Sequence, residues 1–428
     1  MRGFIRICRF IVVAFLAGFS CSSFYDNDLG YPRRDTGNLG RKPQKPTDVL
    51  HDTSVFVTCV EFPSDYCWQR DTAGYDAPFS VSVLKNGERV ISVASGASSM
   101  ISADADMQRF VNGHLYSDYS TPSETIVSKD GEELFRYPGR ERMCGFLVRD
   151  GDIYTLGQNR SGKGLSFRKN GEPIFSSAAG RVIGEMSNSC CESGALYEVE
   201  GDIVFSYKII AESVDKENPA CYLVRNGNSN QIPLDNRVVG IYDARLIGDK
   251  FYVAADMGTR DMSLVLIEDD DIKSYSLAGF GFQLSSCRIL WSGNNVSLKT
   301  DFSYDKWRSS SSVMWHWDGR KIMLNEYERA WDFYLDESSY AYVFTRGENI
   351  VAMSVHKKDD GKCLAFTPGG RYTMISSSCA MLSGGVFYAG LSPCDSSLFP
   401  LVVREDKATT LKINGYITSL NVSIDGKF

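Results

Sequence analysis

The chain has 428 residues but only four histidines, and its 12 cysteines include no Cys-x-x-Cys pair. Because structural zinc sites use closely spaced cysteine and histidine ligands, we expect no metal site. A Gly-x-Ser-x-Gly sequence is also absent, so nothing marks a nucleophile elbow. No stretch of 12 or more residues shows helical periodicity, which favours an all-β fold.

Positive charge is in deficit, with 46 Lys and Arg residues against 53 Asp and Glu and a net charge of −7. Such a chain is a poor match for polyanionic nucleic acid, so we expect no nucleic-acid partner. The composition, 43% hydrophobic and 23% charged, is that of a globular protein. It excludes a mostly disordered, collagen-like or coiled-coil protein.

The N-terminus lacks an apolar run long enough to cross a bilayer. The apolar run over residues 10–19 follows Arg2, Arg6 and Arg9, and a stable transmembrane helix needs about 20 residues. We therefore predict a signal peptide over residues 1–20. Cys21 resembles the lipid-bearing cysteine of a bacterial lipoprotein signal, although Gly18 stands where that signal usually has a branched aliphatic residue. Plain secretion, with Cys21 an ordinary thiol, and an uncleaved anchor are the alternatives.

Residues 21–50 are rich in charge and proline and poor in apolar side chains. They cannot bury enough surface to offset the entropy of ordering them. We expect a flexible tether between a lipid on Cys21 and a folded domain over residues 51–428.

A repeated pair of hairpins is the strongest signal in the remaining sequence. Asn-Gly and Asp-Gly suit type I′ turns, which need positive φ at both central residues. The first hairpin has its turn at Gly87, Gly131, Gly171, Gly227 and Gly319, and more weakly at Asp270, Gly369 and Asp406. The second hairpin alternates with it, as at Asn112-Gly113, Asp150-Gly151 and Arg346-Gly347.

Two hairpins give four strands per repeat, which we call A, B, C and D. The first-hairpin turns are 37 to 56 residues apart, and four strands in about 40 to 50 residues is the blade period of a β-propeller. We predict eight four-stranded antiparallel blades, with seven as the alternative. Residues 417–428 look like an A strand with no B strand after it. Residues 55–60 look like a B strand with no A strand before it. Their pairing would close the ring and bury its edges.

Over residues 51–428 the chain resembles the bacterial β-propeller lipoproteins of the cell envelope, in repeat layout and anchor. The resemblance implies a bacterial outer-membrane protein, lipid-anchored, and periplasmic or surface-exposed. The Asp-x-x-Thr-Gly core of the quinoprotein dehydrogenases is absent, as are the Gly-His and Trp-Asp pairs of WD40 repeats. We expect no cofactor, and a monomer.

Turns A–B and C–D lie on one rim of a blade, while the B–C and D–A connections lie on the other. The second kind include the longest predicted loops, at 61–78, 94–106, 177–193, 208–219, 302–312 and 325–339. Because variable loops on a fixed scaffold carry binding surfaces, we place the functional surface there, although the loops can also be idle insertions.

Loop aromatics with neighbouring charge suit sugar stacking or a protein interface. The candidate ligand-binding residues are Tyr304, Trp307, Arg308, Tyr327, Trp331, Trp68 and Tyr75. The alternative is that these aromatics fold down as local plugs.

An exported chain with an even number of remaining cysteines permits disulfides. Cys59 with Cys67 and Cys379 with Cys394 are close enough in sequence to pair.

We expect a binding or scaffold protein that holds a protein or a glycan on its long-loop rim. The alternative is a carbohydrate-active enzyme, hydrolase or lyase, with acidic residues at the channel mouth. A cluster of carboxylates with an arginine or histidine at the mouth would favour the enzyme, and an apolar or aromatic rim would favour binding. A third reading is a structural spacer whose loops plug the channel.

Overall fold

Residues 50–428 form one compact unit. The predicted signal peptide, Cys21 and the whole of the predicted tether lie outside the residues that the structure describes. No helix among the described residues is long and apolar enough to cross a bilayer. The computed structural model describes residues 53–424 except 71–76, 96–100, 102, 104–107, 160–163, 184–194, 210–218, 259–262, 269–270, 277–282, 293–294, 304–309, 317–320, 324–328, 336–338, 347–348 and 358–362.

The described strands form eight antiparallel sheets, blades 1 to 8. From strand A to strand D, blade 1 consists of β34 (Gly415–Ile424), β1 (Thr53–Glu61), β2 (Ser80–Lys85) and β3 (Glu88–Ala94), and blade 2 of β4 (Gln108–Val111), β5 (His114–Ser120), β6 (Glu124–Lys129) and β7 (Glu132–Pro138). Blade 3 consists of β8 (Glu141–Arg149), β9 (Asp152–Asn159), β10 (Leu165–Lys169) and β11 (Glu172–Ser177). In blade 4, strand A is made of β12 (Arg181–Val182) and β13 (Tyr197–Val199), followed by β14 (Asp202–Ile209), β15 (Ala220–Arg225) and β16 (Asn228–Ile232).

Blades 5 to 8 follow in the same order. Blade 5 consists of β17 (Gly240–Ile247), β18 (Lys250–Asp256), β19 (Ser263–Glu268) and β20 (Asp271–Ser276), and blade 6 of β21 (Gln283–Ser292), β22 (Asn295–Ser303), β23 (Ser310–His316) and β24 (Lys321–Met323). Blade 7 consists of β25 (Arg329–Leu335), β26 (Ser339–Arg346), β27 (Asn349–Lys357) and β28 (Cys363–Phe366). In blade 8, strand A is made of β29 (Tyr372–Thr373) and β30 (Ala380–Ser383), followed by β31 (Val386–Pro393), β32 (Leu401–Arg404) and β33 (Lys407–Thr410). The short 3-10 helices η1 (Trp68–Arg70) and η3 (Ser377–Cys379) also occur.

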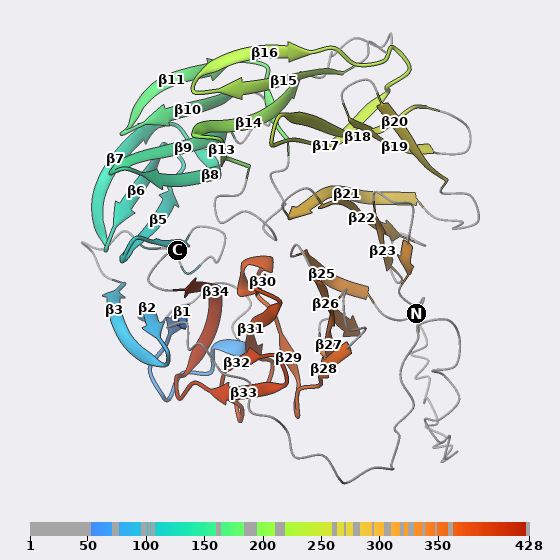
Figure 1. The fold of residues 1–428 in the computed structure, drawn as a ribbon. Helices are drawn as coiled ribbons and strands as arrows, with labels where there is room; N and C mark the ends of the chain where they lie inside the picture. The colour runs from blue at the N-terminus through green and yellow to red at the C-terminus, as the bar shows by residue number, and fades with distance from the viewer. Residues whose placement is uncertain are drawn as a thin grey trace, which may run out of the picture. The chain divides into compact units, whose positions relative to one another are not determined.

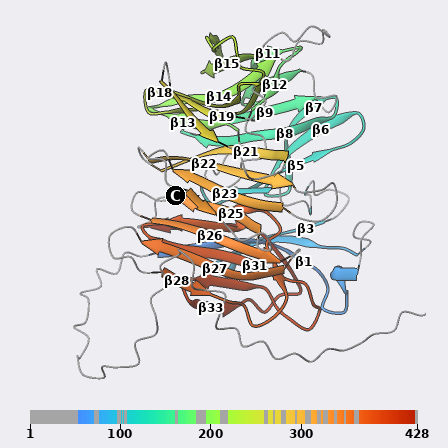
Figure 2. The same ribbon diagram turned by 90° about the vertical axis from the view of Figure 1, so that its right-hand side faces the viewer.

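The blades follow one another around a ring, with the A strands towards its centre (Figure 1). Figure 2 views the ring from the side, where the strands of blades 6 and 7 follow one another from β21 to β28. At the seam β34 pairs with β1, with Val422 opposite Val55 and Leu420 opposite Val57. The predicted propeller of four-stranded antiparallel blades is confirmed, as is its closure by the C-terminal strand.

Apolar clusters fill the spaces between neighbouring blades. Leu156 and Phe167 of blade 3 share a cluster with Phe205 of blade 4, and Val57 of blade 1 shares one with Phe387 of blade 8. Strands in such a fold are apolar on both faces because each face meets another sheet. The core is therefore a series of wedges between blades.

The Asn or Asp of each C–D turn in blades 1 to 4 also fastens the neighbouring B strand. Its side-chain oxygen accepts a hydrogen bond from a B-strand N–H, for example Ile153 N to Asn170 Oδ1 at 2.8 Å. The other three acceptors are Asn86, Asp130 and Asn226. All four residues have positive φ. The turn motif thus holds three strands together as well as reversing the chain.

The Asn170→Ala variant is expected to lose about 1–2 kcal/mol of unfolding free energy beyond the cost of positive φ, because its bonds to Ile153 N and Asp152 Oδ1 disappear. Urea denaturation measures this loss. The matched control is Asn112→Ala, at an A–B turn with φ of 50° against 51° for Asn170. Equal losses in the two variants would show that the side-chain hydrogen bonds of Asn170 add nothing to the unfolding free energy.

Glycine in the C–D turns of blades 2, 3 and 4 also lets each of these blades approach its predecessor. A Cβ on Gly171 would lie 2.8 Å from Phe135 of β7, and one on Gly227 would lie 3.1 Å from the Ile174 carbonyl of β11. The residue that permits the turn therefore also permits close packing of the outer strands.

Blade 7 corrects the predicted strand order. Residues 325–339, predicted as a D–A connection, contain the A strand β25. The turn at 347–348 therefore joins strands B and C, and the C–D connection is 358–362 rather than the predicted turn at Gly369. A register shift between Ala330 and Asp332 breaks the alternation of β25, and this concealed the strand.

Candidate functional site

The two rims of the ring carry different connections. The A–B and C–D connections span two to five residues, mostly two-residue turns, and define the short-turn rim. The B–C and D–A connections define the long-loop rim and include 62–79, 95–107 and 304–309. Residues 121–123, 139–140, 178–180 and 347–348 are short exceptions, and the predicted loop 177–193 contains part of an A strand, β12. The predicted difference between the rims holds for most blades.

Exposed apolar side chains are unevenly distributed over the described residues. Tyr119, Val239, Ile375 and Phe399 are exposed on the long-loop rim. The other large exposed hydrophobics, Val90, Ile174 and Ile272, lie on the outermost strands β3, β11 and β20. Of these seven residues none belongs to a short-turn connection, so the apolar contacts available on a rim are on the long-loop side.

The A strands are irregular near that rim. Five of them carry a one-residue bulge close to their first residues, at Cys144, Tyr242, Ser285, Trp331 and Thr418. In blades 4 and 8 the A strand is interrupted at the same level, between β12 and β13 and between β29 and β30. Bulges bend a strand and re-aim its side chains, and they concentrate at barrel rims and active sites. The A strands of seven blades are therefore irregular near the long-loop rim, and we call this end of the ring the mouth.

Asp243 follows the bulge in β17 and is completely buried. Its Oδ1 accepts the N–H of Ala244 at 2.9 Å, and its Oδ2 accepts the N–H of Ile289 in β21, also at 2.9 Å. Arg245 Nε lies 3.2 Å from Oδ1. This carboxylate joins the A strands of blades 5 and 6 and fixes the bulge beside it.

The Arg245 side chain is only 1% exposed and is enclosed by aromatic rings. Its guanidinium lies 5.4 Å from the Tyr197 ring and 5.5 Å from the Trp291 ring. Tyr197 Oη also accepts the N–H of Leu246 at 2.8 Å. Ring faces and a carboxylate together compensate the buried cation, so this group ties blades 4, 5 and 6 together.

Tyr242 on blade 5 and Ser286 on blade 6 are partly exposed, whereas Lys299 and Asp301 on blade 6 are buried. Tyr242 packs against the cluster between these blades, and burial, then Asp256 and Cys287, raise the pKa of its phenol to about 12. On blade 6, Ser286 Oγ donates to Asp301 Oδ2 at 2.6 Å, with Lys299 Nζ 3.7 Å from the same oxygen. Tyr242 therefore packs toward the face of blade 6 that carries Cys287, whereas Ser286 and Asp301, one position along their strands, lie on the other face.

Most of the predicted binding residues lie outside the described part of the chain, namely Tyr304, Trp307, Arg308, Tyr327 and Tyr75. The strand ends that flank the first three, Ser303 and Ser310, belong to blade 6 on the long-loop rim. Trp331 is the bulged residue of β25 and not the loop residue that we predicted. Whether these residues bind a ligand stays a prediction.

Trp68 lies in η1, and its side chain is in the core at 8% exposure. Its ring centroid is 5.1 Å from Tyr416 and 6.5 Å from Phe62. It therefore offers no stacking face to a ligand and serves as a plug over the blade 1–2 interface, the alternative left open for these aromatics.

Sequence patterns did not indicate Tyr242, Asp243 or Asp256 as members of the mouth. Each is a single polar or aromatic residue within or beside an ordinary strand. Their grouping depends on the bulge in β17 and on a contact with blade 6, which are not local features. The available signal was Asp243 and Arg245, two residues apart in a strand whose other residues are mostly apolar, because buried charges need partners.

The structure holds Cys59, Cys67, Cys379 and Cys394 as thiols. Cys59 is buried in the cluster of blades 8 and 1 that also contains Cys379, whereas Cys67 is half-buried with its Sγ 3.7 Å from Gln69 Oε1. Neither predicted disulfide is formed, and both pairings stay predictions for the exported chain.

In the reduced native protein, iodoacetamide is expected to label Cys67 well before Cys59, Cys221 or Cys287. Burial raises the pKa of all three thiols, that of Cys221 to about 12. The thiolate is the nucleophile. Because the pKa of Cys221 is about three units above its ordinary value, the fraction of Cys221 present as thiolate at pH 8 is about a thousandfold lower. Peptide mass spectrometry measures the order, and early labelling of Cys221 would contradict this packing.

Among the described residues, no three or more His, Cys, Asp or Glu side chains are arranged to hold a metal ion. His114 Nδ1 lies 2.7 Å from Asp130 Oδ2 at a turn, where both side chains are exposed. This pair supports the hairpin geometry of blade 2.

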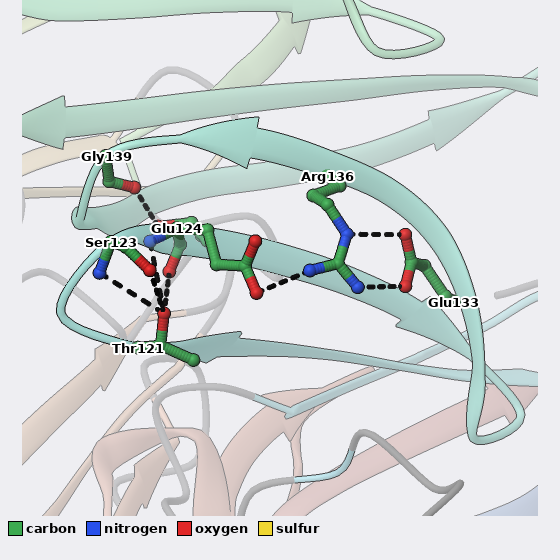
Figure 3. Close-up of polar contacts among 7 residues, drawn as sticks. Thr121, Ser123, Glu124, Glu133, Arg136 and Gly139 are labelled. Carbon is green, nitrogen blue, oxygen red and sulfur yellow. Dashed lines mark hydrogen bonds and ion pairs between the residues drawn. The ribbon is translucent and has the colours of Figure 1, made fainter.

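An exposed polar cluster lies on the outer half of blade 2 (Figure 3). Arg136 of β7 pairs with Glu133 and Glu124, and its hydrogen bond and charge lower the pKa of Glu133. Thr121 Oγ1 accepts the N–H of Glu124 at 3.1 Å and closes the B–C turn. Exposed ion pairs contribute little, so this cluster holds one hairpin and is no site.

No family model and no curated protein matches the chain. Several solved structures are similar. An oligogalacturonate lyase in complex with manganese shares 12% identity at a TM-score of 0.40, with 70% of this chain and 86% of that chain covered. A prolyl endopeptidase shares 9% at 0.43, covering 74% and 49%, and the Pyrococcus horikoshii acylaminoacyl peptidase shares 8% at 0.40, covering 73% and 54%. The chain thus spans about half of each peptidase. Similarity at this level carries no argument about what the chain does.

Proposed function

We propose that this protein is a lipid-anchored β-propeller of the bacterial cell envelope that binds a protein or a glycan through its long-loop rim. The observation that carries the proposal is the difference between the two rims. Exposed apolar residues and A-strand bulges occur on the long-loop rim, and short hairpin turns form the other. Variable loops on a rigid ring are a common location for binding surfaces.

The direction of β1 supports this arrangement. As the B strand of blade 1, β1 begins on the short-turn rim, where Thr53 pairs with Ile424. The chain therefore enters the ring on the rim opposite the long loops.

The contacts of Asp243 do not suit the catalytic acid of the enzyme alternative. Asp243 has an arginine beside it, as the enzyme alternative requires, but it is completely buried and occupied by two backbone N–H groups and Arg245. A general acid or base must come within hydrogen-bond reach of its substrate. Asp243 instead has a structural role.

The proposal is tested by a glycan array and a pull-down screen with the full-length protein in detergent. Trp307→Ala is expected to lose ligand that the parent retains. Val90→Ser, which changes an exposed residue on outer strand β3, is the matched control and is expected to bind as the parent does. If Trp307→Ala keeps every ligand, the aromatic-loop assignment is wrong, and if the parent retains none, the binding function is wrong.

Lipidation is tested separately by detergent phase partitioning of membranes from cells that express the chain. The parent is expected in the detergent phase. Cys21→Ser removes the acceptor thiol and is expected to move the protein to the aqueous phase. A Cys21→Ser protein that remains in the detergent phase would contradict the lipid anchor.

A further inference from the structure

Two positive charges lie directly opposite one another at the mouth, where strand A of blade 4 begins. Arg181, the first residue of β12, pairs with Lys208 near the end of β14. Side chains that are directly opposite share one face of the sheet with their Cβ atoms about 5 Å apart, and like charges in this arrangement are destabilising. Neither side chain forms an ion pair with another described residue. The pair therefore lacks a compensating carboxylate in the described part of the chain.

Lys208 is partly buried between blades 4 and 5. Its Nζ donates a hydrogen bond to the Ile241 carbonyl of β17 at 2.5 Å, which leaves two of its three N–H groups for another acceptor. Burial, and then the Arg181 charge, lower the pKa of Lys208. Asp243 acts in the opposite direction, but two backbone N–H groups and an arginine already occupy its oxygens. An anion bound beside Lys208 would offset both its burial and the neighbouring charge.

Arg181 is held in place by a buried amide of blade 3. The Gln158 side chain, 3% exposed, accepts the N–H of Val182 at 2.8 Å and donates to the Gly180 carbonyl at 3.1 Å. Val182 packs in the cluster between blades 3 and 4, so Arg181, one position earlier, lies on the face that meets blade 5. Its side chain is exposed. An exposed arginine on a fixed backbone loses little conformational freedom when it binds a ligand.

Blade 3 adds two exposed arginines next to this position. Arg142 of β8 pairs with Gln158, the residue that is bonded to the start of β12, and Arg140 immediately precedes β8. Glu141, between the two, instead forms two hydrogen bonds of 2.7 Å with Arg168, whose guanidinium stacks on a tyrosine of blade 2. The charge of Glu141 is therefore compensated on the other face of blade 3. We call the following residues the basic group: Arg140, Arg142, Arg181 and Lys208.

The chemistry of the basic group suits an anionic glycan better than a protein surface. The planar fork of arginine matches the paired oxygens of a carboxylate or a phosphate. The centre of a protein interface is, by contrast, depleted of charge and rich in apolar side chains. Among the described residues from blade 3 to the start of blade 5, Val239 is the only large exposed hydrophobic on the long-loop rim. Positive charge, rather than apolar surface, thus distinguishes this part of the rim in a chain of net charge −7.

We propose that the basic group binds a carboxylate or phosphate group of an acidic oligosaccharide, with Arg181 and Lys208 as the central contacts. Arg140 and Arg142 extend the positive charge onto blade 3. The inference rests on the proposed binding function and narrows it to one ligand class and one part of the rim.

The ligand class is tested by an array of neutral, carboxylated and phosphorylated glycans, with the full-length protein in detergent. An acidic glycan is expected to bind best, and more weakly as salt is added. In titration calorimetry with that glycan, Arg181→Gln is expected to weaken binding about tenfold or more, which corresponds to about 1.4 kcal/mol. The matched control is Arg237→Gln, an exposed arginine on the same rim that Asp235 already compensates at 2.6 Å. It is expected to remain within about twofold of the parent.

The Arg181→Gln variant also tests the site without any ligand. Because the substitution removes one of two like charges, the unfolding free energy measured in urea is expected to equal or slightly exceed that of the parent. A loss of unfolding free energy would show that a carboxylate of this chain already pairs with Arg181, and the anion site would then be wrong.

The binding outcomes separate the two proposals. If the protein binds neutral glycans only, or if folded Arg181→Gln binds the acidic glycan as the parent does, this site is wrong while the binding function stands. If the parent binds no glycan but retains a protein in the pull-down screen, the ligand class is wrong. If it binds neither, the proposed function itself fails.

Discussion

A chain that ends at Lys412 is expected to lose the cooperative unfolding transition of the propeller. This truncation removes β34, the A strand of blade 1 and the only partner of β1 on its inner side. It also takes Tyr416, Ile417, Leu420 and Val422 out of two clusters. Each such side chain contributes about 1.5–3 kcal/mol, so their sum is comparable with a total stability of about 5–15 kcal/mol.

Circular dichroism during thermal unfolding measures this effect. A chain that ends at Ile424 keeps the whole of β34 and serves as the control, with the melting temperature of the parent expected. A Lys412-terminated chain that melts with the same midpoint and cooperativity as the parent would show that β34 is dispensable.

The Asp243→Ala variant is expected to lose about 3–5 kcal/mol of unfolding free energy, because it leaves the buried Arg245 cation without its carboxylate. Two backbone N–H groups, those of Ala244 and Ile289, lose their acceptor as well. Urea denaturation measures the loss of unfolding free energy. A loss of the expected size would show that Asp243 is the main polar link between blades 5 and 6.

A double variant, Asp243→Ala with Arg245→Met, distinguishes the uncompensated charge from the lost hydrogen bonds. Removing both charges is expected to restore part of the stability, since an apolar side chain costs less in this position than an unpaired cation. If the double variant is less stable than Asp243→Ala alone, Arg245 does not depend on Asp243. The Asp235→Ala variant, which changes an exposed pair with Arg237, is the surface control.

The fold was predictable because its turns are local. Asn-Gly and Asp-Gly at 86–87, 130–131 and 170–171 indicate hairpins from two residues alone, and their spacing indicates blades. The unmatched strands at the two ends predicted the closure, since an isolated A strand and an isolated B strand complete one blade. The tandem arrangement therefore needed no tertiary information.

Prediction failed where strand A is irregular. The bulge at Trp331 shifts alternation within β25, so a strand was taken for a loop and the turn at 347–348 was assigned to the wrong rim. The interruptions between β12 and β13 and between β29 and β30 had no turn signal of their own. Bulges depend on what the strand meets across the channel mouth, and local sequence does not record this.

The mouth residues were missed for the same reason. Tyr242 and Asp256 come from β17 and β18, which pair with each other. Sequence analysis chose loop aromatics because they stand out from their neighbours. Of these, Trp68 is a core residue, while the others await the binding experiments.

Oxidative cross-linking of the Val55→Cys/Val422→Cys variant tests ring closure most directly. These positions are opposite one another in the β1–β34 pair, so a linked peptide joining residues 55 and 422 is expected by mass spectrometry under mild oxidation. In Val55→Cys/Asn421→Cys the second cysteine is shifted by one residue to the other face of the sheet, and no link is expected. Absence of the first link, or equal yields of both, would contradict a ring closed by its C-terminal strand.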